Sequence, residues 1–242
     1  MTGPIKRALV AAARGAGYEI ARTNPIYRTA ARLVTMMTYN GVDAVVDVGA
    51  NIGRFGTALR QAGYKGEILS FEPLSEAYGV LEKKSRTDPK WHAFQSAIGA
   101  ENGEAEINIA GNSESSSLLP MLDMHLRNAP ESQYRGKERV KVSTLDSALE
   151  KVLSKESRIL LKIDTQGYEH HVIAGAKSLL RQVCLIECEL SLAPLYEGQY
   201  LFQNMLNLFG QIGFKPVHFD AAFSDRKTGY CLQVDGTFAR SV

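Results

Sequence analysis

Acidic and polar residues follow several apolar runs of this sequence, at the points where we expect strands to end. The run "VVDVGANIGRFG" (45–56) contains Asp47 and then breaks into glycines and an asparagine. Glu72 ends the next apolar run, and Asp164 ends a later one. Ligands of open α/β sheets bind beyond the carboxyl ends of the strands, near the point where the strand order reverses. These residues are therefore candidates for one binding site.

The motif D-x-G-x-N-x-G, formed by Asp47, Gly49, Asn51 and Gly53, indicates which ligand the first turn would accept. A dinucleotide fingerprint needs a glycine where this chain has Asn51. An acid before the turn would repel a pyrophosphate but suits a cation without phosphate, such as S-adenosylmethionine. Glu72 could accept hydrogen bonds from both hydroxyls of a ribose. The pattern favours a methyl donor over a nicotinamide dinucleotide, although the glycines could also serve only a tight turn.

Methyl transfer to an alcohol would require a group that removes the hydroxyl proton, because an alcohol is a weak acid. Asp164 is the predicted base or metal ligand, with a helix N-cap as its alternative role. His125, in the polar stretch 112–136, is a second candidate base or else a surface histidine. Glu187 and Glu189 share one strand face and could join Asp164 in binding Mg²⁺. Ion pairs with Lys or Arg are the alternative for these two glutamates.

Strand-like and helix-like segments alternate along the chain and would position these residues. Apolar runs predict strands at 43–48, 67–73, 91–99, 158–164 and 183–190, with helical periodicity between most of them. Such alternation predicts an α/β sheet with right-handed crossovers. The segments "FKPVHFD" and "GYCLQVDGTFAR" are joined without a helix and should be antiparallel. Ser96 and Ala97, in the third strand segment, complete the predicted cofactor-binding set.

Composition describes an ordinary globular chain of 242 residues, 45% hydrophobic and 22% charged. Residues 1–32 carry six Lys or Arg and one Glu, so we divide the chain into a basic helical arm (1–40) and a catalytic domain (41–242). The arm is a solvated helix, or a frayed arm packed on the domain, or it makes a peripheral contact with the anionic inner face of a membrane. No apolar stretch reaches the roughly 18–20 residues of a membrane span, so the expected location is cytoplasmic. The remainder is not basic, which argues against a nucleic-acid partner.

Seven segments resemble, in chain order, the FkbM-type family of S-adenosylmethionine-dependent O-methyltransferases. They are "VVDVGANIGRFG", "SFEPL", "SSSLLPM", "STLDSAL", "LLKIDTQGYEHHVIAGA", "IECELSLAPLYEG" and "TGYCLQVDGTFAR". The resemblance is narrower to the actinobacterial and mycobacterial branch that methylates sugar hydroxyls of glycolipids and polysaccharides. Many family members read K-I-D-x-E-G where this chain has Gln166, so we assign no acid–base role to that position.

The resemblance implies a Rossmann-like class I methyltransferase fold. Its seven-stranded sheet would be mainly parallel, with the last strand antiparallel beside the fifth and helices on both faces. The implied reaction is in-line displacement at the methyl carbon by a carbohydrate hydroxyl, assisted by a general base, Mg²⁺ or both. The implied acceptor is a sugar of a glycolipid, oligosaccharide or polysaccharide, and the stretch 112–136 would be a lid over it. The alternatives are a nicotinamide-dependent oxidoreductase and a non-catalytic relative that binds S-adenosylmethionine.

Overall fold

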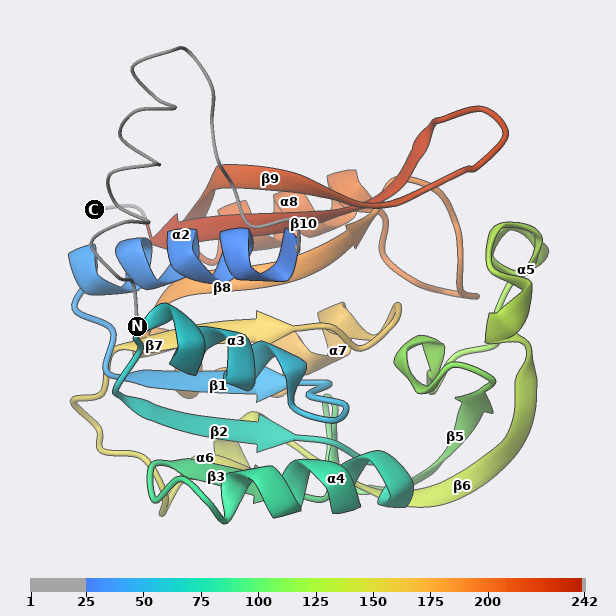
Figure 1. Ribbon diagram of the computed structural model, residues 1–242. Coiled ribbons are helices and arrows are strands. Elements are labelled where there is room, and N and C mark those ends of the chain that lie inside the picture. The colour runs from blue at the N-terminus through green and yellow to red at the C-terminus, as the bar shows by residue number, and fades with distance from the viewer. Residues whose placement is uncertain (1–24, 241–242) are drawn as a thin grey trace, which may run out of the picture.

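The computed structural model describes residues 25–240, and a seven-stranded sheet forms its centre (Figure 1). The strand order is β3-β2-β1-β7-β8-β10-β9. The bounds are β1 Ala44–Val48, β2 Glu67–Phe71, β3 Trp91–Phe94, β7 Ile159–Ile163, β8 Val183–Ser191, β9 Phe214–Ser224 and β10 Cys231–Arg240. β10 lies between β8 and β9 and is antiparallel to both, whereas all other neighbouring strands of this sheet are parallel. The predicted fold is therefore confirmed, including the antiparallel strand beside the fifth.

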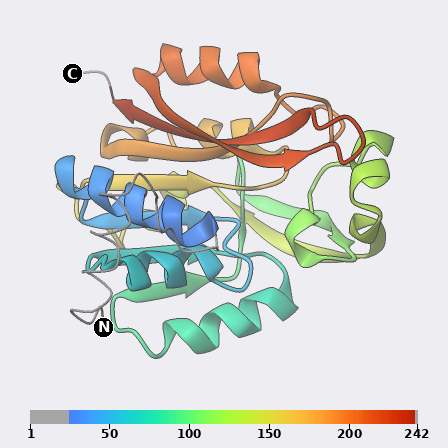
Figure 2. The same ribbon diagram turned by 45° about the horizontal axis from the view of Figure 1, so that its top comes forward.

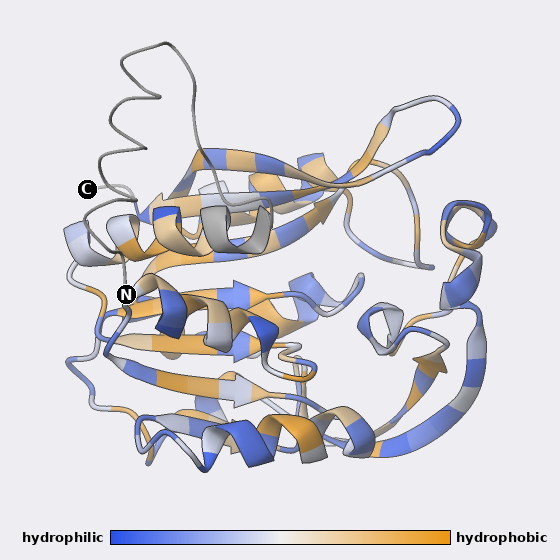
Figure 3. Cartoon of the chain, viewed as in Figure 1, coloured by the Kyte–Doolittle hydropathy of each residue, from blue (hydrophilic) through white to orange (hydrophobic). Residues whose placement is uncertain are grey.

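Helices cover both faces of this sheet, which explains why its central strands are almost wholly apolar (Figures 2 and 3). All five residues of β1 are buried. One face carries α2 (Pro25–Tyr39), α3 (Arg54–Ala62) and α4 (Ser75–Ser85). The other carries α6 (Leu145–Leu149), α7 (Glu169–Ala174) and α8 (Phe202–Gln211), with the short helix η3 (Leu179–Arg181) before β8. Each face thus has its own apolar core.

A second, three-stranded sheet lies at the carboxyl ends of the parallel strands (Figure 1). It consists of β4 (Ala97–Ile98), β6 (Tyr134–Ser143) and β5 (Gly103–Ala110). The segment 91–99, predicted as one strand, is divided between the two sheets. The Ser96 hydroxyl donates to the Lys141 carbonyl and to Ser143 Oγ, which ties the chain to β6 after it leaves the main sheet.

The polar stretch between β5 and β6 contains structure of its own. It forms η1 (Ser113–Ser115), α5 (Asp123–Asn128) and η2 (Pro130–Ser132). This whole segment lies at the same end of the molecule as the second sheet (Figure 1). Its position over the carboxyl ends of the strands agrees with the expectation that a long polar stretch would be functional.

Helix α2 packs on the main sheet. Leu33 and Met37 are fully buried beside Leu59 of α3 and apolar residues of β1, β7 and β8. Most of the basic arm, with its predicted membrane contact, falls in residues 1–24, outside the described residues. Within residues 25–240, no helix combines the length and hydrophobicity needed to cross a membrane.

Candidate active site

A cavity of about 940 Å³ opens at the carboxyl ends of the parallel strands. Residues from the ends of β1, β2, β7 and β8 line it, together with parts of the segment 112–132, helix α2 and the β9–β10 hairpin. The predicted site residues found in its lining are Gly49, Asn51, Glu72, Ser96, Ala97, His125, Asp164, Glu187 and Glu189. The structure therefore brings most of the predicted site together, while Asp47 and Gly53 lie outside the lining.

Glu72 organises the turn after β1. Its Oε2 accepts a hydrogen bond from the Asn51 amide at 2.8 Å, and its Oε1 accepts from the Leu74 amide at 2.9 Å. Burial raises the pKa of Glu72 to about 7, although these two amides oppose the rise. Asn51 adopts the left-handed conformation (φ 47°), and its side chain donates to Ser113 Oγ. Both carboxylate oxygens are thus fixed at the cavity wall, and each keeps a lone pair for a further donor.

The glycines of the first motif serve contacts within the chain, and Gly49 also lines the cavity. A Cβ on Gly49 (φ +78°) would lie 1.8 Å from the carbonyl oxygen of Asp164. A Cβ on Gly53 would lie 2.9 Å from Leu81 and 3.1 Å from Trp91. Gly49 therefore permits the close approach of the loops after β1 and β7, and Gly53 permits packing against the side chain of Trp91.

Asp47 does not line the cavity, so the predicted contact with a cationic ligand is wrong for this residue. Its side chain is fully buried. Its Oδ2 accepts a hydrogen bond from Ser70 Oγ at 3.2 Å, and its Oδ1 lies 3.6 Å from Lys162 Nζ. Burial raises the pKa of Asp47, and the Lys162 ammonium opposes that rise. The acid is a partner for a lysine inside the protein.

Asp47 belongs to a polar row that crosses the sheet. The row occupies paired positions on β2, β1, β7, β8, β10 and β9, namely Ser70, Asp47, Lys162, Glu187, Thr237 and His218. Buried polar groups need partners of this kind, because an unpaired charge in an apolar interior is costly. The row separates the apolar core under α2 and α3 from the cavity.

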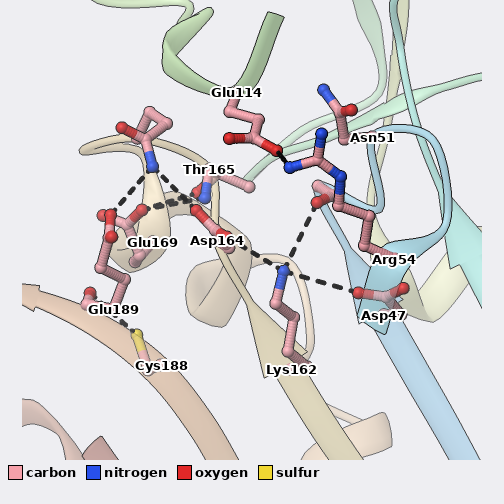
Figure 4. Close-up of polar contacts among 12 residues, drawn as sticks. Asp47, Asn51, Arg54, Glu114, Lys162, Asp164, Thr165, Glu169, Cys188 and Glu189 are labelled. Atoms are coloured by element: carbon pink, nitrogen blue, oxygen red, sulfur yellow. Dashed lines mark hydrogen bonds and ion pairs between the residues drawn. The ribbon is translucent and has the colours of Figure 1, made fainter. Parts of the chain in front are cut away.

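Lys162 connects Asp47 to Asp164 (Figure 4). Its Nζ lies 3.1 Å from Asp164 Oδ2 and 3.4 Å from the carbonyl oxygen of Gly49. Burial alone would lower the pKa of Lys162, but Asp164 and then Asp47 raise it above its ordinary value. Lys162 was not among the site residues predicted from the sequence. A lysine inside the otherwise apolar run "RILLKID" was the available signal.

Gln166 bridges two carboxylates at the cavity wall. Its Nε2 donates to Asp164 Oδ1 at 2.8 Å and to Glu189 Oε2 at 2.9 Å. Its Oε1 accepts from the hydroxyl of Tyr196 at 2.8 Å. With Lys162 on its other oxygen, Asp164 has a donor on each oxygen, which fixes the position of the carboxylate.

The loop after β7 is held by Glu169. One oxygen of Glu169 accepts from the amides of Thr165 and Gly167, each at 3.0 Å. The N-cap residue of α7 is Tyr168. The alternative role of Asp164 as a helix N-cap is therefore wrong, and Asp164 is left facing the cavity with its side chain 37% exposed.

The predicted metal-binding set does not converge. Gln166 lies between Asp164 and Glu189, Glu189 also accepts from Gln233, and Glu187 accepts from the Thr237 hydroxyl at 2.5 Å. Among residues 25–240 there is no group of three or more His, Cys, Asp or Glu side chains placed to hold a metal ion. The arrangement of Asp164, Glu187 and Glu189 therefore does not fit Mg²⁺, and we assign no step of the reaction to a metal ion.

His125 is buried in the cavity lining, so its alternative as a surface histidine is wrong. It is 3% exposed, and its ring lies between Tyr196 and Phe223, with centroids 5.2 and 5.6 Å away. Its Nδ1 has no hydrogen-bond partner among the described residues. Burial lowers the pKa of His125. The imidazole is therefore neutral at physiological pH.

The contact between Tyr196 and Gln166 yields a modest prediction. Tyr196→Phe removes the hydroxyl that Gln166 Oε1 accepts from and leaves that buried acceptor unpaired. We expect the free energy of unfolding to fall by about 1–3 kcal/mol, measured by urea denaturation. Tyr134→Phe is the matched control, because its hydroxyl donates only to the Leu119 carbonyl at 2.7 Å. If activity falls with Tyr196→Phe but not with Tyr134→Phe, the Gln166 bridge has a role in the reaction; equal losses contradict that role.

Comparison with known proteins identifies the family. Residues 47–216 match the sequence model described as "Methyltransferase FkbM domain". The chain belongs to the FkbM methyltransferase family. This membership overturns the nicotinamide-dependent oxidoreductase considered from the sequence.

The chain is also similar to individual proteins. The chain is 26% identical over 170 residues to the 2-O-methyltransferase NoeI of Sinorhizobium fredii, a match that covers 68% of this chain and 70% of NoeI. Its fold resembles a Klebsiella pneumoniae protein assigned as an O-methyltransferase, with a TM-score of 0.52 and 9% identity over 99% of this chain and 91% of that one. At that identity the likeness concerns the fold alone. Magnesium protoporphyrin IX methyltransferase from Synechocystis, solved with S-adenosylmethionine bound, gives a TM-score of 0.48 and 12% identity over 93% and 88% of the two chains.

This FkbM methyltransferase is an S-adenosylmethionine-dependent enzyme, and its cavity fits that cofactor. Glu72 presents a fixed carboxylate at the end of β2, suited to hydroxyl donors, and Asp164 presents a second at the end of β7. Carboxylates at these positions suit a ligand with hydroxyls and positive charge. When bound, S-adenosylmethionine supplies the electrophilic methyl group, and the residues of the chain hold and orient it.

Proposed function

We propose that this enzyme transfers the methyl group of S-adenosylmethionine to a hydroxyl of a carbohydrate. The observation that carries the proposal is the composition of the cavity beyond Glu72. There the lining includes four carboxylates and an amide from β8, β9 and β10, namely Glu187, Glu189, Asp220, Gln233 and Asp235, together with Phe223, Arg32 and Arg226. Carboxylates and amides bind hydroxyl groups, and aromatic rings pack against the apolar side of a ligand.

The relative NoeI supports the choice of oxygen as the methyl acceptor, because it is named as a 2-O-methyltransferase. The cavity volume of about 940 Å³ is at the upper end of the range for small-molecule sites and is large enough for a cofactor beside an acceptor sugar.

The roles of the residues follow from their contacts. We assign Glu72 to the ribose hydroxyls, because both its oxygens are fixed by backbone amides. We assign Asp164 to positioning of the cofactor, because it lines the cavity and Lys162 and Gln166 hold its two oxygens. In-line displacement requires the acceptor oxygen, the methyl carbon and the sulfur to be aligned, and such alignment is a large part of the rate of a two-substrate reaction.

A panel of p-nitrophenyl glycosides and neutral oligosaccharides tests the proposal. Each is incubated with the enzyme and S-adenosylmethionine, and the product is analysed for the mass of one added methyl group. We expect methylation of at least one sugar, absent when the cofactor is omitted. If no sugar gains a methyl group while calorimetry shows that S-adenosylhomocysteine binds, the carbohydrate assignment is wrong. Parallel reactions with EDTA and with added Mg²⁺ test metal assistance.

A further inference from the structure

Three carboxylates lie side by side at paired positions on the last three strands of the sheet. Asp235 on β10 is directly opposite Glu189 on β8 and opposite Asp220 on β9. All three line the cavity. Like charges at directly opposite positions of antiparallel strands destabilise a sheet. Because these carboxylates destabilise the sheet and lie at the cavity wall, we infer that they have a functional role.

The two outer carboxylates of this row have protein donors. Glu189 accepts from Gln166 and from Gln233, at 2.9 and 2.6 Å. Asp220 accepts from the Thr29 hydroxyl at 3.1 Å and from Arg32 at 2.6 Å, and it also contacts His218 Nε2 at 3.1 Å. These donors hold both side chains in place.

Asp235 differs from its neighbours because it accepts no side-chain hydrogen bond from any residue in 25–240. Three other carboxylates of the site have donors: Glu72 has two amides, Asp164 has Lys162 and Gln166, and Glu187 has Thr237. Asp235 is largely buried yet lines the cavity. A cavity-lining carboxylate with free lone pairs can accept a proton from a ligand.

The groups around Asp235 bring its pKa close to neutral pH, where a general base works best. Burial raises the pKa of Asp235 to about 6; Asp164 and Asp220 add to the rise, whereas Lys162 and Arg32 oppose it. The titratable and charged groups packed around it are Arg32 on α2, Lys162 on β7, Asp164 directly after β7, Glu187 and Glu189 on β8, and His218 and Asp220 on β9. A general base is most effective when its pKa is near the working pH.

We propose that Asp235 is the general base that takes the proton of the acceptor hydroxyl. The inference rests on the proposed function, since it requires a hydroxyl acceptor. Asp235 lies outside residues 47–216, so the match to the family gives it no role. It is also a different residue from Asp164 and His125, the two bases expected from the sequence.

The step balances as follows. An Asp235 carboxylate oxygen accepts the hydroxyl proton as the acceptor oxygen bonds to the methyl carbon. The carbon–sulfur bond breaks and its electron pair stays on sulfur, which becomes neutral. The proton on Asp235 then passes to solvent, so each turnover releases one proton. No oxidant, reductant or metal ion is required.

The test compares the wild type with Asp235→Asn, which keeps the shape of the side chain and removes its basicity. The acceptor is the glycoside of the panel that the wild type methylates fastest. S-adenosylmethionine is kept saturating, so that protonation of Glu72 does not limit the rate. In the wild type, kcat/KM for the acceptor should then rise with pH through an apparent pKa of about 6, because the carboxylate is the active form. In Asp235→Asn, kcat should fall by about a hundredfold, the rising limb should disappear, and KM should change by much less than kcat.

A second readout does not depend on turnover. In ¹³C NMR spectra of enzyme labelled at its aspartate carboxyl carbons, one resonance should titrate near pH 6 in the wild type and be missing in Asp235→Asn. Calorimetry with S-adenosylhomocysteine should give the same affinity for both proteins, which shows that the variant is folded.

Asp220→Asn is the matched control, because it removes a carboxylate of the same row that already has protein donors. The pH profile of kcat/KM for Asp220→Asn should keep its rising limb, even if kcat falls. An Asp235→Asn variant that keeps the limb and the wild-type kcat overturns the inference, as does an Asp235 resonance that titrates at the ordinary aspartate pKa. Either result can occur while sugars are methylated, which leaves the proposed function intact. If no sugar is methylated, the proposed function fails and this inference fails with it.

Discussion

Glu72→Gln should weaken the binding of S-adenosylhomocysteine by about a hundredfold. The carboxylate accepts amide hydrogen bonds on both oxygens, from Asn51 and Leu74. A glutamine would place an NH₂ group against one of these N–H donors, which disrupts the turn after β1 and removes an acceptor for the ribose. Hydrogen bonds to a charged group are worth about 1.5–3 kcal/mol each, so loss of one or two gives a change of this size. Isothermal titration calorimetry measures it.

The pH dependence of cofactor binding provides a second check on Glu72. Burial raises its pKa to about 7. The ionised carboxylate accepts from two hydroxyls, whereas the protonated form has one oxygen acting as a donor. Affinity for S-adenosylhomocysteine should therefore fall as the pH drops below about 7, and Glu72→Gln should lack this dependence. Glu76→Gln, at an exposed position of α4, is the control and should match the wild type. Equal affinities for all three proteins would remove Glu72 from the cofactor site.

The sequence was most informative about the ends of the parallel strands. Glu72 and Asp164 follow apolar runs, and parallel strands bring their carboxyl ends to one edge, so their meeting in one cavity could be predicted. The direction in which each side chain points could not be predicted. Asp47 also ends an apolar run, yet its side chain points into the protein interior, because Asp47 is paired with Ser70 and Lys162 in the sheet. Whether an acid meets a ligand or a buried lysine depends on strand register, which a single sequence does not state.

The acceptor half of the cavity was harder to predict because it depends on long-range pairing. Asp235 is one polar residue in the alternating run "CLQVDGTFAR", where a solvent-facing position explains it equally well. Its position beside Glu189 follows from the insertion of β10 between β8 and β9. Thr29 and Arg32 reach the same wall from α2, almost two hundred residues earlier in the chain than Asp220. The prediction of an arm over residues 1–40 did not include this contact with Asp220.

Lys162→Met should lower the free energy of unfolding by about 3–5 kcal/mol, because it leaves the carboxylate of Asp47 buried without a counter-charge. For a chain of this size the corresponding fall in melting temperature is roughly 10 °C. Thermal and urea denaturation measure both quantities. A loss below about 1 kcal/mol, the value typical of an exposed ion pair, would show that Asp47 has no need of Lys162.

A double-mutant cycle separates the two carboxylates that contact Lys162. Asp164 Oδ2 is the nearer, at 3.1 Å, but that side chain is 37% exposed, whereas Asp47 is fully buried with Oδ1 at 3.6 Å. Water can replace the lysine at Asp164 and cannot reach Asp47. We therefore expect a coupling energy of about 2 kcal/mol between Lys162→Met and Asp47→Asn, and less than about 1 kcal/mol between Lys162→Met and Asp164→Asn. The reverse order would mean that distance, rather than desolvation, decides the strength of this ion pair, and that Lys162 serves the cavity more than the sheet.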